Sequence, residues 1–234
     1  MLVFPGALGV ADWSGEVLSL LAAQRRVLVF DYGLERQAEP LFARVLASIG
    51  AEPVDVLGFS IGGWLGQCLA ARAPERVRKL VLAHSFVLDP TDAWRFSLAR
   101  FLWPMLPPPV FRAAATRRAR AALAPLREAR PEAFETAMRA VTAALIAVDA
   151  KAKLVAQQQA VCDSLAGFAP PPAEVLIIDS DDDPVVPRAA QARLAATYPN
   201  AVHVTLANGG HSGALLDPEG FATAVDRFLQ ADTG

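Results

Sequence analysis

Short runs of apolar residues alternate along the chain with longer segments in which apolar residues recur at helical spacing. The apolar runs are rich in Val, Leu and Ile and show no clean alternation with polar residues, which is typical of strands covered on both faces. Such strands lie parallel and are joined by crossover helices. We predict six strands: Leu2–Phe4, Val27–Phe30, Val54–Leu57, Leu80–Ala83, Val175–Ile178 and Val202–Leu206.

Helices are predicted between these strands. One ends at Gly50, another begins directly after a strand and stops before Pro74, and the last opens with Pro218, a residue favoured in the first helical turn. The pattern therefore predicts an α/β fold, a mostly parallel sheet of about six strands with helices on both faces. The predicted helices are 13–23, 36–49, 61–73, 188–197 and 218–230.

The alternation breaks between Phe86 and Pro170. This interval has no convincing strand, contains three consecutive prolines at 107–109 and is rich in alanine. A proline-rich segment at 168–174 then leads into the next strand. We therefore predict an inserted helical cap or lid at 86–170, over one end of a core formed by 1–85 and 171–234.

Composition limits the class of protein. A chain of 234 residues with 53% hydrophobic and 20% charged residues fits one core with an insertion. A net charge of −2 shows no bias toward nucleic acid or a membrane surface. The first residues lack the basic region of a signal peptide, and no apolar run is long enough to span a membrane. We expect a cytoplasmic protein that does not bind nucleic acid.

The two cysteines do not indicate a function. Cys68 and Cys162 are too few for a disulfide framework and lack the spacing of metal ligands. We expect them to be small buried apolar residues.

A candidate nucleophile stands at a strand-to-helix junction. The strand ending VDVLGFS runs directly into IGGWLGQCLAARA, so that Ser60 lies between Gly58 and Gly62. A nucleophile elbow requires this context, because the serine sits in a sharp turn that side chains at the flanking positions would obstruct. The following helix directs its N-terminal amides at the serine and favours negative charge there. A structural glycine-rich turn is the alternative.

His211 is the candidate base among three histidines. It lies in NGGHSG between the last strand and the final helix, at the sheet edge where α/β proteins place their sites. A serine needs such a base within hydrogen-bond reach. His203 lies inside a strand, and His84 ends the strand before the cap, where we expect it to line the substrate pocket.

The candidate acid lies in EVLIIDSDDDPVVPRAA, which contains Asp179, Asp181, Asp182 and Asp183. An acid is needed to hold the imidazole in one tautomer and to stabilise the imidazolium. An aspartate after a strand can also cap the next helix, so one of the four is expected to serve the histidine and another to act as a cap.

Two backbone amides are expected to form an oxyanion hole. The amide of Ile61 follows the nucleophile directly, and the loop after the first strand supplies a second amide, which we assign to Ala7.

These motifs resemble those of the α/β-hydrolase superfamily over nearly the full chain. The order Ser60, Asp183, His211 is the order of that fold. Its acid loop usually reads Gly-x-x-Asp, an apolar pair and Pro, a register that selects Asp183, with Asp182 or Asp181 as the alternatives. Ser180 replaces the customary Gly of that loop, and Pro5 stands where relatives usually carry His.

Within the superfamily the chain resembles the maspardin-like branch. The matching segments are Leu57–Gln67, Leu82–Phe86 and Tyr198–Ala201. Maspardin is regarded as a binding protein, so the resemblance implies a non-catalytic interaction module as an alternative.

The cap carries an aromatic cluster and a basic stretch. We expect Trp94, Phe101 and Trp103 to line an apolar acyl pocket above Ser60, although such a cluster can also be the core of the cap itself. The cluster comprises Trp94, Phe96, Phe101, Trp103, Met105 and Phe111, and the basic stretch comprises Arg112, Arg117, Arg118, Arg120, Arg127 and Arg130. A basic stretch is more often a solvated helix face than a site for an anionic substrate or an acidic protein partner.

Together these motifs predict a serine hydrolase that cleaves small-molecule carboxylic esters or thioesters of apolar acyl groups. Ser60 attacks, His211 accepts its proton, Asp183 orients His211, and an acyl-enzyme forms and is hydrolysed. No metal and no organic cofactor is implied, because the triad handles this chemistry. A C–C bond hydrolase with the same triad and a non-catalytic module remain the alternatives.

Overall fold

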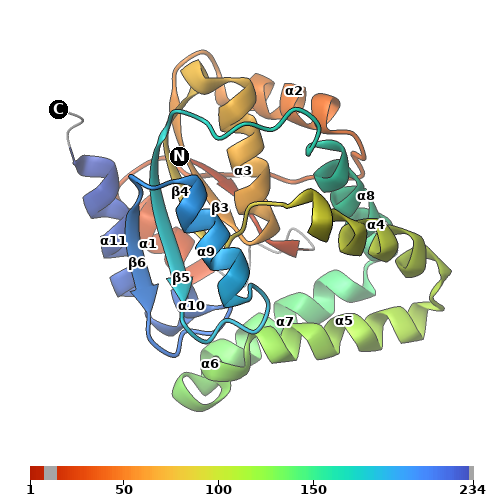
Figure 1. Ribbon diagram of the computed structural model, residues 1–234. Helices are drawn as coiled ribbons and strands as arrows, with labels where there is room; N and C mark the ends of the chain where they lie inside the picture. Colours follow the sequence, from red (N-terminus) through yellow and green to blue (C-terminus); the bar gives the residue numbers. More distant parts are fainter. Residues whose placement is uncertain (8–14, 232–234) are drawn as a thin grey trace.

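A six-stranded parallel sheet forms the centre of the molecule. The computed structural model describes residues 1–7 and 15–231 (Figure 1). Each neighbouring pair of strands is parallel, in the order β2-β1-β3-β4-β5-β6. The strands are β1 (Leu2–Phe4), β2 (Leu28–Val29), β3 (Val54–Phe59), β4 (Val77–Ala83), β5 (Glu174–Ser180) and β6 (Val202–Leu206).

Each face of the sheet has its own apolar core. In β4, Leu80 and Leu82 face the core that contains α2, α3 and α9, while Val81 and Ala83 face the core that contains α1 and α11. The helices outside the insertion are α1 (Gly15–Ala22), α2 (Ala38–Ile49), α3 (Ile61–Arg72), α9 (Arg188–Thr197), α10 (Gly213–Leu216) and α11 (Pro218–Gln230), with a 3₁₀ turn, η3 (Pro74–Arg76). Because both faces of the sheet are covered, most strand residues are buried and apolar, whereas the edge strand β6 keeps exposed positions.

Helix α3 packs against the sheet on one side and against the insertion on another. It is apolar nearly all round, and ten of its residues are buried, as expected for a helix enclosed on all sides. The indole of Trp64 donates a 2.9 Å hydrogen bond to Ser164 Oγ, which follows the last helix of the insertion. Helix α3, which begins directly after Ser60, is therefore held both by the sheet and by the insertion.

Five helices are inserted between β4 and β5 and lie together beside the core (Figure 1). One apolar cluster, around Phe111 and Leu154, lies within the insertion, and a second, around Leu126 and Met138, also includes Leu215 of α10. This arrangement supports the proposed division into a core and a cap at 86–170. The helices are α4 (Pro90–Met105), α5 (Pro108–Ala122), α6 (Ala124–Ala129), α7 (Pro131–Ile146) and α8 (Ala150–Asp163).

The predicted fold class is confirmed, with shifts at the ends of elements. The strand predicted at 27–30 shortens to two residues, and β4 begins three residues earlier than predicted. The first two residues of the helix predicted at 13–23 lie outside the described residues. Among the described residues, no helix is both long and apolar enough to cross a membrane.

Candidate active site

Ser60 occupies a strained turn between β3 and α3. Its φ of 52° and ψ of −121° lie in a region that residues other than glycine rarely adopt and that costs about 1–3 kcal/mol. Two hydrogen bonds hold it there: its amide donates to the Ala83 carbonyl at 2.9 Å, and its carbonyl accepts from Ser85 Oγ at 2.9 Å. The strand β4 therefore fixes the conformation that presents the serine.

The glycines around Ser60 are required by backbone contacts. A Cβ on Gly58 would lie 2.4 Å from the Cα of Gly63, and one on Gly62 would lie 2.3 Å from the Phe4 carbonyl oxygen. Backbone atoms cannot withdraw as a flexible side chain can, so a larger residue would displace β1 or α3. The Gly-x-Ser-x-Gly spacing thus reflects close packing of β1, β3 and the start of α3.

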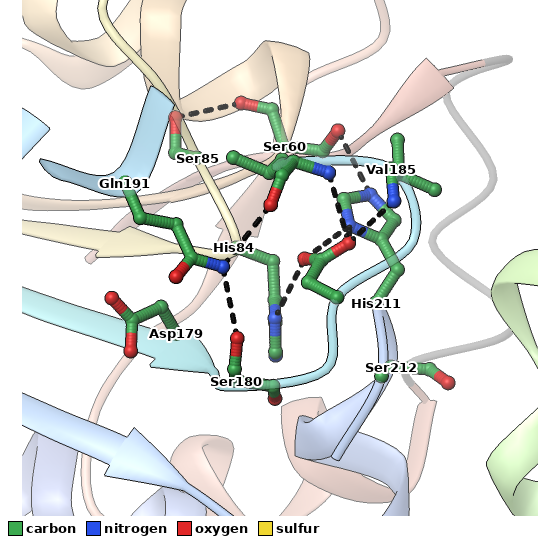
Figure 2. A network of polar contacts seen from close by, with 12 residues as sticks. Ser60, His84, Ser85, Asp179, Ser180, Val185, Gln191, His211 and Ser212 are labelled. Atoms are coloured by element: carbon green, nitrogen blue, oxygen red, sulfur yellow. Dashed lines mark hydrogen bonds and ion pairs between the residues drawn. The ribbon is translucent and has the colours of Figure 1, made fainter. Parts of the chain in front are cut away.

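His211 links Ser60 to a buried carboxylate (Figure 2). Its Nε2 lies 3.1 Å from Ser60 Oγ, and its Nδ1 lies 2.8 Å from Oδ2 of Asp183. All three side chains come from loops that follow strands at the same edge of the sheet. In this arrangement the carboxylate keeps a proton on Nδ1 and leaves Nε2 to accept the serine proton.

Asp183 is held in its ionised form. Burial raises the pKa of its carboxyl, but hydrogen bonds from His211 and His84 and from the Val186 amide outweigh this, and the pKa is held well below its ordinary value. The amides of Val185 and Val186 donate to Oδ1 at 2.8 and 2.9 Å. The anion is therefore available to stabilise an imidazolium at neutral pH.

The two alternative acids hold the histidine loop instead. Asp182 accepts a 2.8 Å hydrogen bond from the Gly210 amide, and Asp181 accepts a 3.1 Å hydrogen bond from the Asn208 amide. Within the described residues, Asp183 is the aspartate whose carboxylate hydrogen-bonds to His211. The consecutive aspartates thus divide between orienting the imidazole and shaping the turn that carries it.

His84 does not line the substrate cavity, contrary to the sequence prediction. It is 2% exposed, it is absent from the cavity lining, and its Nδ1 lies 3.4 Å from Oδ2 of Asp183. Its ring meets that of His211 edge to face at 5.8 Å. Burial lowers the pKa of His84 more than Asp183 raises it, so the ring is neutral. Its backbone, with a φ of 48°, turns the side chain inward from the end of β4.

Among the described residues, one group of side chains is close enough together to hold a metal ion. It comprises His84, Asp183 and His211, whose possible ligand atoms lie within 4.8 Å of one another. Asp183 already accepts hydrogen bonds from His211 and from two backbone amides. With these donors around it, the Asp183 carboxylate is placed to orient His211.

The two predicted oxyanion residues line the same cavity as Ser60. Ala7 follows β1, and Ile61 is the first residue of α3, where backbone amides have no intrahelical acceptor. Two buried side chains hold the loop after β1: Tyr32 Oη donates to the Pro5 carbonyl at 2.6 Å, and Gln157 Nε2 donates to the Gly6 carbonyl at 3.1 Å. The sequence analysis did not single out either residue, since each is remote from the loop in sequence.

A cavity of about 610 Å³ opens above Ser60 and His211. The core supplies loop residues such as Val185, and the cap supplies Ala119, Leu154 and the predicted Trp103. Most of the lining is apolar, which suits an apolar acyl group.

Trp94 and Phe101 lie outside this cavity, contrary to prediction. They are 57% and 62% exposed, and with Leu98 and Met105 they follow the three- and four-residue spacing of one outward face of α4. The sequence does not indicate which face of a cap helix turns toward the core. Phe111 is buried against Trp103 in the cap core, and the side chain of Phe96 lies outside the described residues.

Comparison with known proteins gives the same class. The sequence profile of the alpha/beta hydrolase family matches residues 1–224. A Caulobacter segnis protein named carbamate hydrolase RutD is 28% identical over 219 residues, which cover 85% of this chain and 73% of that protein. The 2-hydroxymuconate semialdehyde hydrolase of a Pseudomonas species is 38% identical over 95 residues, which cover 35% of this chain and 33% of that protein. A hydrolase from Pseudomonas aeruginosa, known from its crystal structure, is 26% identical in sequence and superposes with a TM-score of 0.77. The match covers 98% of this chain and 90% of that chain.

A parallel sheet that carries a strained serine beside a histidine and a carboxylate defines the class of α/β-hydrolase enzymes. The match over residues 1–224 is specific: the chain belongs to the alpha/beta hydrolase family. The predictions of the superfamily and of a hydrolytic enzyme are thereby confirmed. The resemblance to the maspardin-like branch stays a prediction.

The lowered pKa of Asp183 predicts a loss of stability in acid. A carboxyl whose pKa is lower in the folded than in the unfolded chain stabilises the fold above its ordinary pKa, and this contribution is lost as the pH falls toward the folded value. We expect the gap in urea midpoint between the wild type and Asp183→Asn to narrow as the pH falls from about 5 to about 3. A gap that stays constant over this range would contradict the assignment.

Proposed function

We propose that the protein is a serine hydrolase that cleaves carboxylic esters or thioesters of apolar acyl groups, with Ser60, His211 and Asp183 as its catalytic triad. The observation that carries the proposal is the continuous chain from Ser60 Oγ through both imidazole nitrogens to a carboxylate, with steps of 3.1 and 2.8 Å. The serine end of this chain opens into an apolar cavity.

In the proposed mechanism, Ser60 Oγ attacks the carbonyl carbon while His211 Nε2 accepts the hydroxyl proton. Asp183 stabilises the imidazolium, and the amides of Ala7 and Ile61 donate to the oxyanion of the tetrahedral intermediate. As the intermediate collapses, His211 protonates the departing alcohol or thiol. Water, deprotonated by the same histidine, then hydrolyses the acyl-enzyme and regenerates Ser60. The mechanism calls for no metal or organic cofactor.

The proposal is tested by trapping the nucleophile. A fluorophosphonate probe should add one phosphonyl group to the wild type, located at Ser60 by peptide mass spectrometry, and the wild type should hydrolyse 4-nitrophenyl butyrate. Labelling at another residue, or hydrolysis that persists after complete labelling of Ser60, would exclude Ser60 as the nucleophile. A chain that is neither labelled nor active would favour a non-catalytic interaction module.

Two other substrates are suggested by named relatives. One relative is named a carbamate hydrolase, and another hydrolyses 2-hydroxymuconate semialdehyde, a C–C bond substrate. The second match covers 35% of this chain, so the C–C bond reaction remains the alternative. Both reactions can use a triad of this kind, and the residues that line the pocket decide between them. Parallel assays with an ester, a carbamate and a 2-hydroxy-6-oxo-dienoate separate the three.

A further inference from the structure

The lining of the cavity above Ser60 includes an arginine of the cap, Arg118 on α5. None of the described lining residues is Asp or Glu. The remainder is apolar apart from Ser60, His211, Gln158 and Arg193. A carboxylate that entered this cavity would meet Arg118, with no carboxylate among the described lining residues to compete for it.

Arg118 is placed by the cavity-facing side of α5. The lining residues of this helix, Ala115, Arg118, Ala119 and Ala122, follow the i, i+3, i+4, i+7 spacing of one helix face. The three alanines leave space beside the arginine. Arg118 makes no ion pair or hydrogen bond within the described part of the chain, whereas Arg130 of the same basic stretch pairs with Glu16.

We propose that the active site takes substrates that carry a carboxylate away from the scissile carbonyl, and that Arg118 binds this carboxylate. Arginine is suited to the role because its planar guanidinium donates two parallel hydrogen bonds to a carboxylate. Arg118 is exposed, so its guanidinium can reach a carboxylate at the opening of the cavity without losing its own contact with solvent. The inference names the substrate class of the hydrolase proposed above and rests on that proposal.

The test compares a neutral and an anionic ester with the same leaving group, 4-nitrophenyl butyrate and mono(4-nitrophenyl) glutarate. We expect the wild type to favour the glutarate ester in kcat/KM, and Arg118→Gln to lower that preference about tenfold while the butyrate ester changes little. Arg118→Glu should reverse the preference. Arg117→Gln is the matched control, because Arg117 is the preceding residue of α5, is exposed and does not line the cavity.

Two outcomes would overturn the proposal. One is a glutarate preference that is unaltered in both Arg118 variants, and the other is a wild type without such a preference. In either case hydrolysis of the butyrate ester would leave the serine hydrolase assignment intact. If no ester is hydrolysed, binding decides: Ser60→Ala should bind hexanoate more tightly than hexanol, and Arg118→Gln should remove the difference.

A second, independent observation concerns the cap helix α8. The carbonyl of Gly6 and the amide of Ala7 belong to one peptide unit, in which C=O and N–H of a trans bond point in opposite directions. Gln157 on α8 holds this carbonyl from the cap side at 3.1 Å. Ala7 itself lines the cavity with Ser60.

We infer that Gln157 is a positioning residue, which aims the Ala7 amide at the oxyanion. Tyr32 assists from the core by fixing the preceding carbonyl, that of Pro5, at 2.6 Å. A helix of the cap thereby completes an oxyanion hole whose own residues belong to the core. Loss of this anchor should weaken binding of the transition state more than binding of the substrate.

The variants Gln157→Leu and Tyr32→Phe test this role. We expect Gln157→Leu to lower kcat about tenfold with little change in KM, and to weaken binding of a trifluoromethyl ketone by a similar factor. Tyr32→Phe should act in the same direction. Gln159→Leu on the same helix is the control. An unchanged kcat in both variants would overturn the inference. A lower melting temperature with a raised KM and an unchanged kcat would also overturn it, because that pattern indicates a structural role only.

Discussion

Replacement of Ser60 by alanine is expected to reduce ester hydrolysis at least a thousandfold, to near the background rate, while the fold is retained. The change removes only Oγ, the atom that lies 3.1 Å from His211 Nε2. His211→Ala should cause a comparable loss, because the hydroxyl is a weak nucleophile without its base. Steady-state rates with 4-nitrophenyl butyrate, with circular dichroism to check folding, provide the measurement.

The combined variant distinguishes a triad from two unrelated contributions. Because the serine and the histidine act as one unit, the double variant should be no slower than either single variant. Losses that multiply in the double variant would mean that the two residues act independently. Residual activity in all three variants is expected from substrate binding and the oxyanion amides.

Asp183→Asn is expected to lower kcat by roughly a thousandfold to ten-thousandfold. An amide in place of the carboxylate presents an N–H group to Nδ1 or favours the opposite tautomer, which places a proton on Nε2 where the serine proton should go. The buried carboxylate accepts hydrogen bonds from the imidazole at 2.8 and 3.1 Å. The neighbouring Asp181 and Asp182 bind backbone amides instead and cannot take over this role.

Asp182→Asn is the matched control for this prediction. Asp182 accepts a hydrogen bond from the Gly210 amide, and the side-chain oxygen of asparagine can accept the same bond. We therefore expect nearly wild-type rates. If instead Asp182→Asn loses as much activity as Asp183→Asn, the acid has been assigned to the wrong aspartate.

The sequence identified the two residues whose neighbours in the chain are informative. Ser60 stands between glycines at the end of an apolar run, and the structure explains this pattern by backbone contacts of Gly58 and Gly62. His211 was selected by its position after the last strand, and the structure places it 3.1 Å from Ser60. The parallel sheet brings the two residues to the same edge, because the loops that follow parallel strands all lie at that edge.

Residues whose positions depend on how the cap packs could not be predicted in this way. Trp94 and Phe101 were expected in the pocket because they are large and apolar, but they lie on the outer face of α4. Arg118 was one of six equivalent arginines until the orientation of α5 was known. Helical periodicity shows which residues share a face, whereas the direction of that face depends on contacts between elements.

The sequence by itself determined the parallel α/β sheet and indicated Ser60 as the proposed nucleophile, His211 as the proposed base and an insertion between the fourth and fifth strands. These follow from local hydrophobic periodicity and from glycine and proline positions. Only the tertiary structure decided that Asp183 hydrogen-bonds to His211, that His84 is buried beside Asp183, and that Gln157 of α8 holds the loop before Ala7. These choices depend on contacts between residues that are far apart in the chain. Burial and hydrogen bonding select among such contacts only once the elements have packed.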